Sequence, residues 1–253
     1  MRPRIVVLSG AGLSADSGIA TYRGDGGVYR GALSEDVMGW RTLRDAPELI
    51  HGLCDDRRVE LGRVRPNAAH EAVAELARRY GDQFVHFTQN IDDLVERTGF
   101  NGSVHVHGLL TRMRSVGNSK IEVDIGYKRY WSGSPEDAPD GGFQFRCPKS
   151  NSRFRPAVVL YGEAAPLYVK LWQQMRRLRS SDLLIVIGTE GAVLPIDMWA
   201  RQTSAFKVLN NLDDAAEIDA GNFDVYLKER AETAAEKILQ IAEDHMSGFK
   251  FSR

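Results

Sequence analysis

Short apolar runs rich in branched side chains alternate along the chain with segments in which apolar residues recur every three or four positions. The runs predict strands, and the recurring segments predict amphipathic helices. Strands that are apolar on both faces are typical of a parallel sheet covered by helices on both sides. Six strands are predicted, over residues 5–9, 84–88, 104–106, 157–161, 183–188 and 207–211.

Three helices can be placed between and after these strands. Asn67 is suited to cap a helix that continues to Tyr80, Pro166 is suited to open a second helix, and a third is predicted over residues 231–245. The alternation of strands and helices predicts a doubly wound α/β fold with a Rossmann-like parallel sheet. The apolar positions of the three helices are Ala69, Val73, Leu76 and Tyr80; Leu167, Leu171, Met175 and Leu178; and Ala234, Ala235, Ile238, Ile241 and Ala242.

Two long stretches interrupt this alternation, at residues 21–65 and 111–155, and both contain many Gly, Arg, Ser or Asp residues. Long irregular insertions in a compact domain usually form functional loops or small modules. We therefore predict a single catalytic domain over residues 1–253 with a cofactor loop and a small inserted module in these two stretches. Its Rossmann-like part is expected to comprise residues 1–20, 66–110 and 156–253.

Composition excludes several classes of protein. The chain has 33 Lys and Arg against 34 Asp and Glu, so no bulk charge favours a nucleic acid or an anionic membrane surface as partner. No apolar run approaches the roughly 18 residues that a membrane-spanning helix needs. The two cysteines, Cys54 and Cys147, form no disulfide framework, which favours a reducing, cytoplasmic location. Arginine clusters at 57–58 and 176–179 are expected on solvated faces, and the oligomeric state is left undetermined.

The first predicted strand leads directly into a glycine-rich turn, GAGLSA at residues 10–15. A G-x-G-x-x-G/A turn between a strand and a helix allows the backbone to approach a pyrophosphate, which the amide groups of the helix N-terminus can bind. A common dehydrogenase would continue to a second strand with an acidic ribose ligand about 20 residues further on. Here the chain instead enters the loop TYRGDGG at residues 21–27, which argues against that class.

Further motifs, in order along the chain, resemble those of the sirtuin family of NAD-dependent protein deacylases. The motifs are GAGLSADSGIATYRG at residues 10–24, TQNID at 88–92, HVHG at 105–108, RPAVVLYGE at 155–163, GT at 188–189 followed by VLP at 193–195, and NLD at 211–213.

This resemblance implies that NAD is consumed as a co-substrate rather than reduced. The acyl oxygen of an acyl-lysine would attack the nicotinamide ribose, nicotinamide would leave, and lysine would be freed as O-acyl-ADP-ribose forms. His107 matches the general base, and its type of side chain is suitable because the ordinary pKa of histidine, about 6.5, lies near working pH. Asn90 matches the residue that positions a water or hydroxyl group.

The resemblance also assigns the binding sites. Acyl-lysine would add as a strand between the segments around Tyr161 and Leu194. The expected substrate contacts are Val159, Tyr161, Gly162 and Leu194. The expected NAD contacts are Gly10, Ala11, Gly12, Asp16, Tyr22, Arg23, Gln89, Ile91, Asp92, Gly188, Thr189, Asn211 and Leu212.

The sequence departs from the family where the relatives hold zinc with two C-x-x-C pairs. Counting from His107, the first pair falls on Ser115 and Asn118, and the second falls on Cys147 and Ser150. Serine and asparagine do not replace thiolates in a tetrahedral zinc site, so we expect no zinc. The small module would then be held by packing, through aromatic residues such as Tyr127, Tyr130, Trp131, Phe143 and Phe145.

Two other departures bear on chemistry. Glu190 stands where the relatives have the serine of G-T-S, and its carboxylate would weaken NAD binding if it faced the pyrophosphate; it could instead turn outward or bind a ribose hydroxyl. Relatives that prefer acidic acyl groups carry Y-x-x-R, and those positions fall on Cys54 and Arg57. Arg57 is therefore a candidate contact to an acyl carboxylate, although the tyrosine is missing.

Three functions remain open on the sequence alone. The leading hypothesis is an NAD-dependent protein-lysine deacylase that acts on NAD and an acyl-lysine protein or peptide. The altered small module and Glu190 motivate the alternative of a sirtuin-like mono-ADP-ribosyltransferase or NAD glycohydrolase. A non-catalytic sensor of NAD or ADP-ribose is the third, and the retention of Asn90, Asp92 and His107 argues against it.

Overall fold

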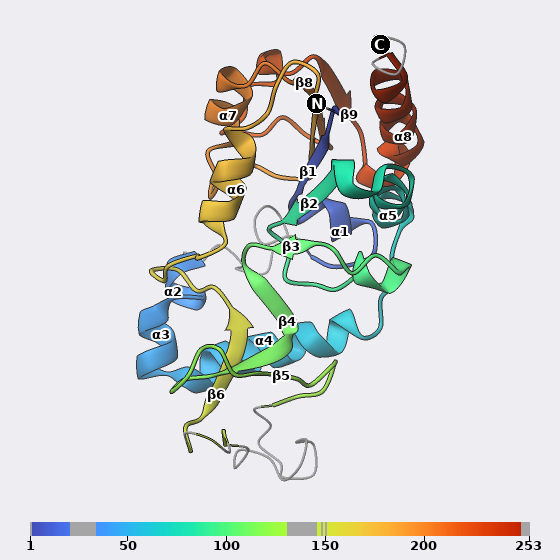
Figure 1. Ribbon diagram of the computed structural model, residues 1–253. Coiled ribbons are helices and arrows are strands. Elements are labelled where there is room, and N and C mark those ends of the chain that lie inside the picture. The colour runs from blue at the N-terminus through green and yellow to red at the C-terminus, as the bar shows by residue number, and fades with distance from the viewer. Residues whose placement is uncertain (1, 21–33, 131–145, 148, 150, 249–253) are drawn as a thin grey trace.

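The computed structural model describes residues 2–20, 34–130, 146–147, 149 and 151–248, and it has two sheets with helices around them (Figure 1). The larger sheet has six parallel strands in the order β3-β2-β1-β7-β8-β9. These strands are β1 (Ile5–Ser9), β2 (Phe84–Thr88), β3 (Val104–His105), β7 (Leu183–Ile187), β8 (Phe206–Asn211) and β9 (Val225–Lys228).

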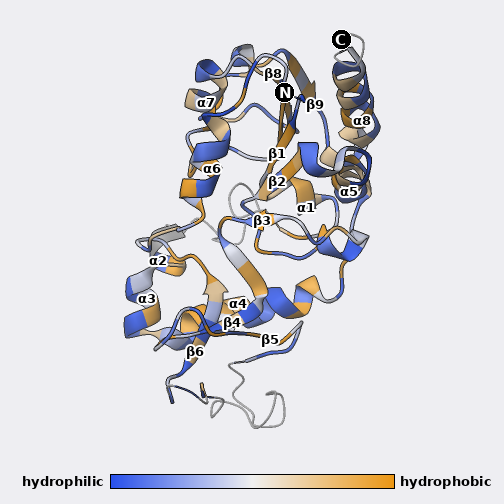
Figure 2. Cartoon of the chain, in the orientation of Figure 1, coloured by the Kyte–Doolittle hydropathy of each residue, from blue (hydrophilic) through white to orange (hydrophobic). Residues whose placement is uncertain are grey.

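The helices cover both faces of the larger sheet, which confirms the doubly wound α/β fold. Successive side chains of a strand point to opposite faces. Val6 and Leu8 of β1 accordingly pack with α6 (Tyr168–Met175) and α7 (Ile196–Gln202). Ile5 and Val7 pack with α5 (Ala68–Tyr80) and α8 (Ala231–Gly248) on the other face. Figure 2 shows β1 and β2 mainly in hydrophobic colours, whereas the helices carry both colours.

Asn67 caps α5 as predicted, because its side chain accepts hydrogen bonds from the amides of Ala69 and His70. In the second helix, α6 begins at Tyr168 rather than at Pro166, and Leu167 is exposed rather than buried. The remaining short helices are α1 (Gly12–Ala15), η1 (Gly81–Gln83), η2 (Glu96–Thr98) and η5 (Ala220–Asn222).

The smaller sheet has three antiparallel strands in the order β5-β4-β6. They are β4 (Gly108–Ser115), β5 (Glu122–Asp124) and β6 (Phe154–Val158), and α2 (Ser34–Val37), α3 (Trp40–Asp45) and α4 (Pro47–Leu61) accompany them. The strand predicted over 157–161 was wrong in position and in partner: β6 ends at Val158 and pairs with β4 in this second sheet. A short apolar run does not reveal which sheet a strand joins.

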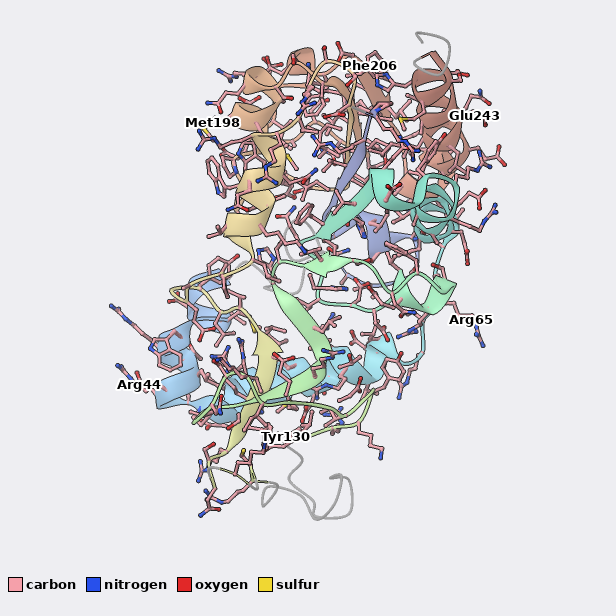
Figure 3. All side chains as sticks on the ribbon, in the orientation of Figure 1. Arg44, Arg65, Tyr130, Met198, Phe206 and Glu243 are labelled. Carbon is pink, nitrogen blue, oxygen red and sulfur yellow. The ribbon has the colours of Figure 1, made fainter. Side chains whose placement is uncertain are left out.

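A buried ion pair ties α4 to the smaller sheet. Arg58 and Asp55 are both fully buried and hydrogen bonded to each other, so the prediction that Arg58 lies on a solvated face was wrong. The Arg58 guanidinium also donates to the carbonyl oxygens of Leu110 (2.8 Å) and Lys128 (3.1 Å). Asp55 accepts a 2.9 Å hydrogen bond from the amide of Tyr130, which Figure 3 shows in the lower part of the molecule.

The described residues at the zinc positions of the sirtuin family do not form a metal site. Cys147 is buried with Met113, Tyr130 and Phe154, while Ser115 shares a 2.8 Å hydrogen bond with the hydroxyl of Ser152. Asn118 accepts a hydrogen bond from the Lys120 amide. Ser150, like Trp131, Phe143 and Phe145, lies outside the described residues. This donor set does not fit zinc, and the absence of zinc from the protein stays a prediction.

Among the described helices, none is both long and apolar enough to span a bilayer.

Candidate active site

A cavity of about 800 Å³ lies where the order of the larger sheet reverses, at the carboxyl ends of β1 and β7. Its volume is within the range of ligand pockets, roughly 300–1,000 Å³. In doubly wound sheets this reversal opens a crevice in which ligands bind. The predicted site residues that line the cavity are Gly10, Ala11, Gly12, Asp16, Gln89, Asn90, Ile91, His107, Val159, Tyr161, Gly162, Gly188, Thr189, Asn211 and Leu212.

The remaining predicted site residues have other positions. Asp92 is buried beside the cavity without lining it, and the Leu194 side chain lies in the core of the larger sheet. Arg57 does not line the cavity either; it forms a 3.0 Å ion pair with Glu60, one turn further along α4. Tyr22 and Arg23 lie outside the described residues.

The glycines of the first turn allow two backbones to pass close to each other. The amides of Gly10 and Gly12 donate to the carbonyl oxygens of Ile187 (2.9 Å) and Gly188 (2.8 Å). A Cβ atom on Gly10 would lie 2.7 Å from the Gly188 oxygen, and one on Gly12 would lie 2.6 Å from Gly188 Cα. The glycines therefore bring the turns after β1 and β7 together, and this contact forms the floor of the cavity.

His107 follows β3, and the contacts of its two ring nitrogens define its tautomer. Nδ1 lies 2.8 Å from the carbonyl oxygen of Gln89, which only accepts hydrogen bonds, so Nδ1 carries a proton. Nε2 lies 2.7 Å from the Tyr168 hydroxyl. In the neutral ring the lone pair is therefore on Nε2 and the phenol donates to it. Burial lowers the pKa of His107, which favours this neutral form, although the hydrogen bond to Gln89 opposes the shift.

Ser14 organises the polar residues next to His107. Its hydroxyl accepts a 3.1 Å hydrogen bond from Asn90 Nδ2 and donates a 2.9 Å hydrogen bond to Asp92 Oδ2. His70 Nε2 lies 3.2 Å from the same hydroxyl. Asp92 also accepts from the amide of Leu94, while its burial raises the pKa of the carboxyl. Asp92 is thus placed to orient Asn90 through Ser14.

At the other end of the cavity, polar contacts connect the turns after β2, β7 and β8. The Asn211 amide forms hydrogen bonds of 2.9 Å with both the N–H and the carbonyl oxygen of Thr189, whose hydroxyl accepts a 2.9 Å bond from Gln89. Glu190 lines the cavity and is exposed. Arg230, the residue before α8, forms an ion pair with the buried carboxylate of Asp16, with 2.7 Å between the paired atoms.

A further part of the cavity lining, around Tyr161, lies next to the smaller sheet. Tyr161 donates its amide proton to Met38 and accepts from the Trp40 amide, both at 2.9 Å, so residues 38–40 already pair with this segment. In the facing segment Val193 is exposed and lines the cavity, whereas the side chain of the predicted contact, Leu194, is buried in the core. Val193 is therefore the residue of this segment whose side chain is better placed to meet a substrate.

Sequence reasoning missed Tyr168 as a lining residue. Tyr168 stood next to the apolar positions of the second predicted helix. The sequence shows only that a residue with a polar phenol follows Leu167, and this does not indicate contact with His107. That contact joins positions separated by 61 residues.

Comparisons with known proteins agree with this geometry. The model of the Sir2 family matches residues 10–195. An NAD-dependent protein deacylase of Helicobacter hepaticus is 33% identical over 255 residues, which cover 92% of this chain and 95% of that protein. One from Campylobacter jejuni is 35% identical over 226 residues, covering 89% and 90%.

Solved structures agree as well. A complex of a mutant Sir2 homologue with ADP-ribose has a TM-score of 0.79 and 29% identity over 96% of this chain and 93% of that one. A complex of a Sir2 homologue with NAD has a TM-score of 0.76 and 30% identity, covering 96% and 90%.

Proposed function

The chain belongs to the Sir2 family and is an NAD-dependent protein deacylase, and we propose that it uses His107 as general base and Asn90 as positioning group to free lysine side chains from acyl groups. NAD is the co-substrate, and nicotinamide and O-acyl-ADP-ribose are the other products. The observation that supports this assignment is that both residues line the same cavity, at the point where the strand order of the larger sheet reverses.

The cavity suits a dinucleotide in volume and in polar groups. It is lined by His107 and also by Thr189, Asn211 and Leu212 from the turns after β7 and β8. We assign the His107 end to the nicotinamide ribose and the Leu212 end to the adenosine. That Sir2 homologues of similar structure were solved with NAD or ADP-ribose supports the choice of ligand.

His107 is prepared to take a proton at a defined atom. The carbonyl oxygen of Gln89 holds the proton on Nδ1, so Nε2 is the basic nitrogen that faces the cavity. Its lowered pKa keeps the imidazole neutral at neutral pH, as a general base must be. A ribose hydroxyl that reaches Nε2 has to replace the Tyr168 phenol as its hydrogen-bond donor.

Asn90 is held in one orientation by Ser14 and its neighbours. Because Ser14 accepts from Asn90 Nδ2 and donates to Asp92, rotation of the amide would break a buried hydrogen bond. Asp92 is therefore placed to act on Asn90 through Ser14. The acyl-lysine is assigned to the wall formed by Val159, Tyr161, Gly162 and Val193, next to His107.

Mass spectrometry of the products tests this proposal. The protein is incubated with NAD and with acetyl-, succinyl- or long-acyl-lysine peptides, and His107→Ala is compared with His245→Gln, a histidine change on α8 away from the cavity. Free lysine and O-acyl-ADP-ribose with the wild type and H245Q, and neither with H107A, would support it. Nicotinamide release without free lysine would instead indicate the transferase or glycohydrolase, and NAD binding without turnover would indicate a sensor.

A further inference from the structure

His105 lies two residues before the proposed base, and its side chain is 9% exposed. Nδ1 lies 3.0 Å from the carbonyl oxygen of Asn90, and Nε2 lies 2.9 Å from Oε1 of Glu96 on η2. A carbonyl oxygen only accepts, and an ionised carboxylate only accepts. Both ring nitrogens must therefore donate, which requires a protonated imidazolium ring.

With the contact from His105, the backbone N–H, the backbone carbonyl oxygen and the side-chain NH₂ of Asn90 all have hydrogen-bond partners. The Asn90 amide N–H donates to the Thr88 hydroxyl at 3.1 Å, and its side chain donates to Ser14 at 3.1 Å. His105 holds the remaining backbone group, the carbonyl oxygen. We propose that His105 and Glu96 are positioning residues for the deacylation reaction, which hold Asn90 in place only while His105 is protonated. This inference rests on the role of Asn90 proposed above.

The surroundings of His105 favour its charged form. Burial lowers its pKa, but the hydrogen bond and the charge of Glu96, the Asn90 carbonyl oxygen and the charge of Asp92 together raise it above the ordinary value. His86 on β2 also interacts with His105, and it is neutral, because burial lowers its pKa to about 3. His70, on the other side of Asn90, is neutral as well, since burial lowers its pKa to about 4.

Loss of the proton would change the contact with Asn90 from attractive to repulsive. Neutral His105 has one N–H for two acceptors, and the carboxylate of Glu96 is the stronger acceptor. The proton would remain on Nε2, and the Nδ1 lone pair would then face the Asn90 carbonyl oxygen. Because the pKa of His105 is raised above its ordinary value, this contribution is present below that raised pKa and is lost as the pH rises through it.

Substitutions can separate this role from a structural one. In Glu96→Gln the amide NH₂ donates to Nε2, so that a neutral His105 keeps its proton on Nδ1 and keeps the contact with Asn90. In His105→Asn the amide nitrogen stands near the former Nδ1 and donates at every pH. His105→Leu removes the donor, and a charge-assisted hydrogen bond is worth about 1.5–3 kcal/mol, or roughly tenfold and more in rate.

The experiment measures kcat from about pH 6.5 to about pH 9.5 at saturating NAD and acetyl-lysine peptide, with a thermal melt of each variant. We expect kcat of the wild type and of H245Q to fall on the alkaline side, and the normalised profiles of E96Q and H105N to lose that fall. We expect kcat of H105L to lie roughly tenfold below that of H105N. An alkaline fall that persists in E96Q and H105N, or H105L within twofold of H105N, would overturn the proposal.

The two proposals fail in different ways. If H107A turns over like the wild type, the assignment of the base is wrong whatever the histidine profiles show. If H107A is inactive and E96Q keeps the alkaline fall of the wild type, only the role of His105 and Glu96 is wrong. Should H105L fail to fold, E96Q still decides, because it conserves the size of the side chain.

Discussion

Replacing Arg58 by methionine should destabilise the protein by about 3–5 kcal/mol, the cost of breaking a buried ion pair by removing one partner. Arg58 and Asp55 have side chains that are 0% exposed, and the guanidinium supplies donors to Leu110 and Lys128 on separate segments of the smaller sheet region. Methionine would fill part of the volume but would leave the Asp55 carboxylate without its cation. The loss is a large part of the roughly 5–15 kcal/mol that stabilises a typical domain.

Urea unfolding followed by circular dichroism measures this loss, and hydrogen exchange localises it to β4 and β6 relative to β1 and β7. Arg57→Met is the matched control, because its pair with Glu60 is partly exposed and worth at most about 1 kcal/mol. Combining Arg58→Met with Asp55→Leu should recover most of the stability, since no buried charge remains. An R58M variant no less stable than R57M would refute the reasoning.

Four further predictions follow from the site and the smaller sheet. Tyr168→Phe removes the phenol that occupies His107 Nε2 and should raise kcat/KM up to about fivefold in steady-state kinetics; a fall would show that the phenol takes part in turnover. Because burial lowers the pKa of His107, activity should persist as the pH falls to about 6.5 and be lost only below it, and an acid limb well above that value would contradict the burial. Gly108→Ala places a Cβ 2.0 Å from the Ala157 oxygen at φ +85°, and a thermal melt should show a loss of about 2–4 kcal/mol; an unchanged melting temperature would mean that β4 and β6 do not pair this closely. Dialysis against a chelator should leave the melting temperature and activity unchanged, whereas a clear drop in either would reveal a metal site.

The local sequence pattern was sufficient to predict the bounds of elements whose side chains are mostly buried or whose ends carry a capping residue. Strands β1 and β2 have the predicted bounds, and α5 has the predicted cap, because a continuous apolar run or an Asn at a helix start carries its own signal. The glycine turn and the positions of Asn90 and His107 could also be read from local motifs, since strand ends of a parallel sheet meet at one edge.

The sequence by itself thus predicted the fold class and the family, and most of the site residues that it predicted line the cavity. Only the tertiary structure decided which strand pairs with β6 and which residues contact Tyr168 and His105. It also decided that the Arg58 side chain is buried while that of Arg57 is partly exposed. Each of these features depends on which residue, distant in the sequence, supplies the hydrogen-bond acceptor, the opposite charge or the side chain that buries the group. Arg57 and Arg58 are neighbours of the same type, yet a turn of about 100° around the helix axis separates a partly exposed pair from a fully buried one.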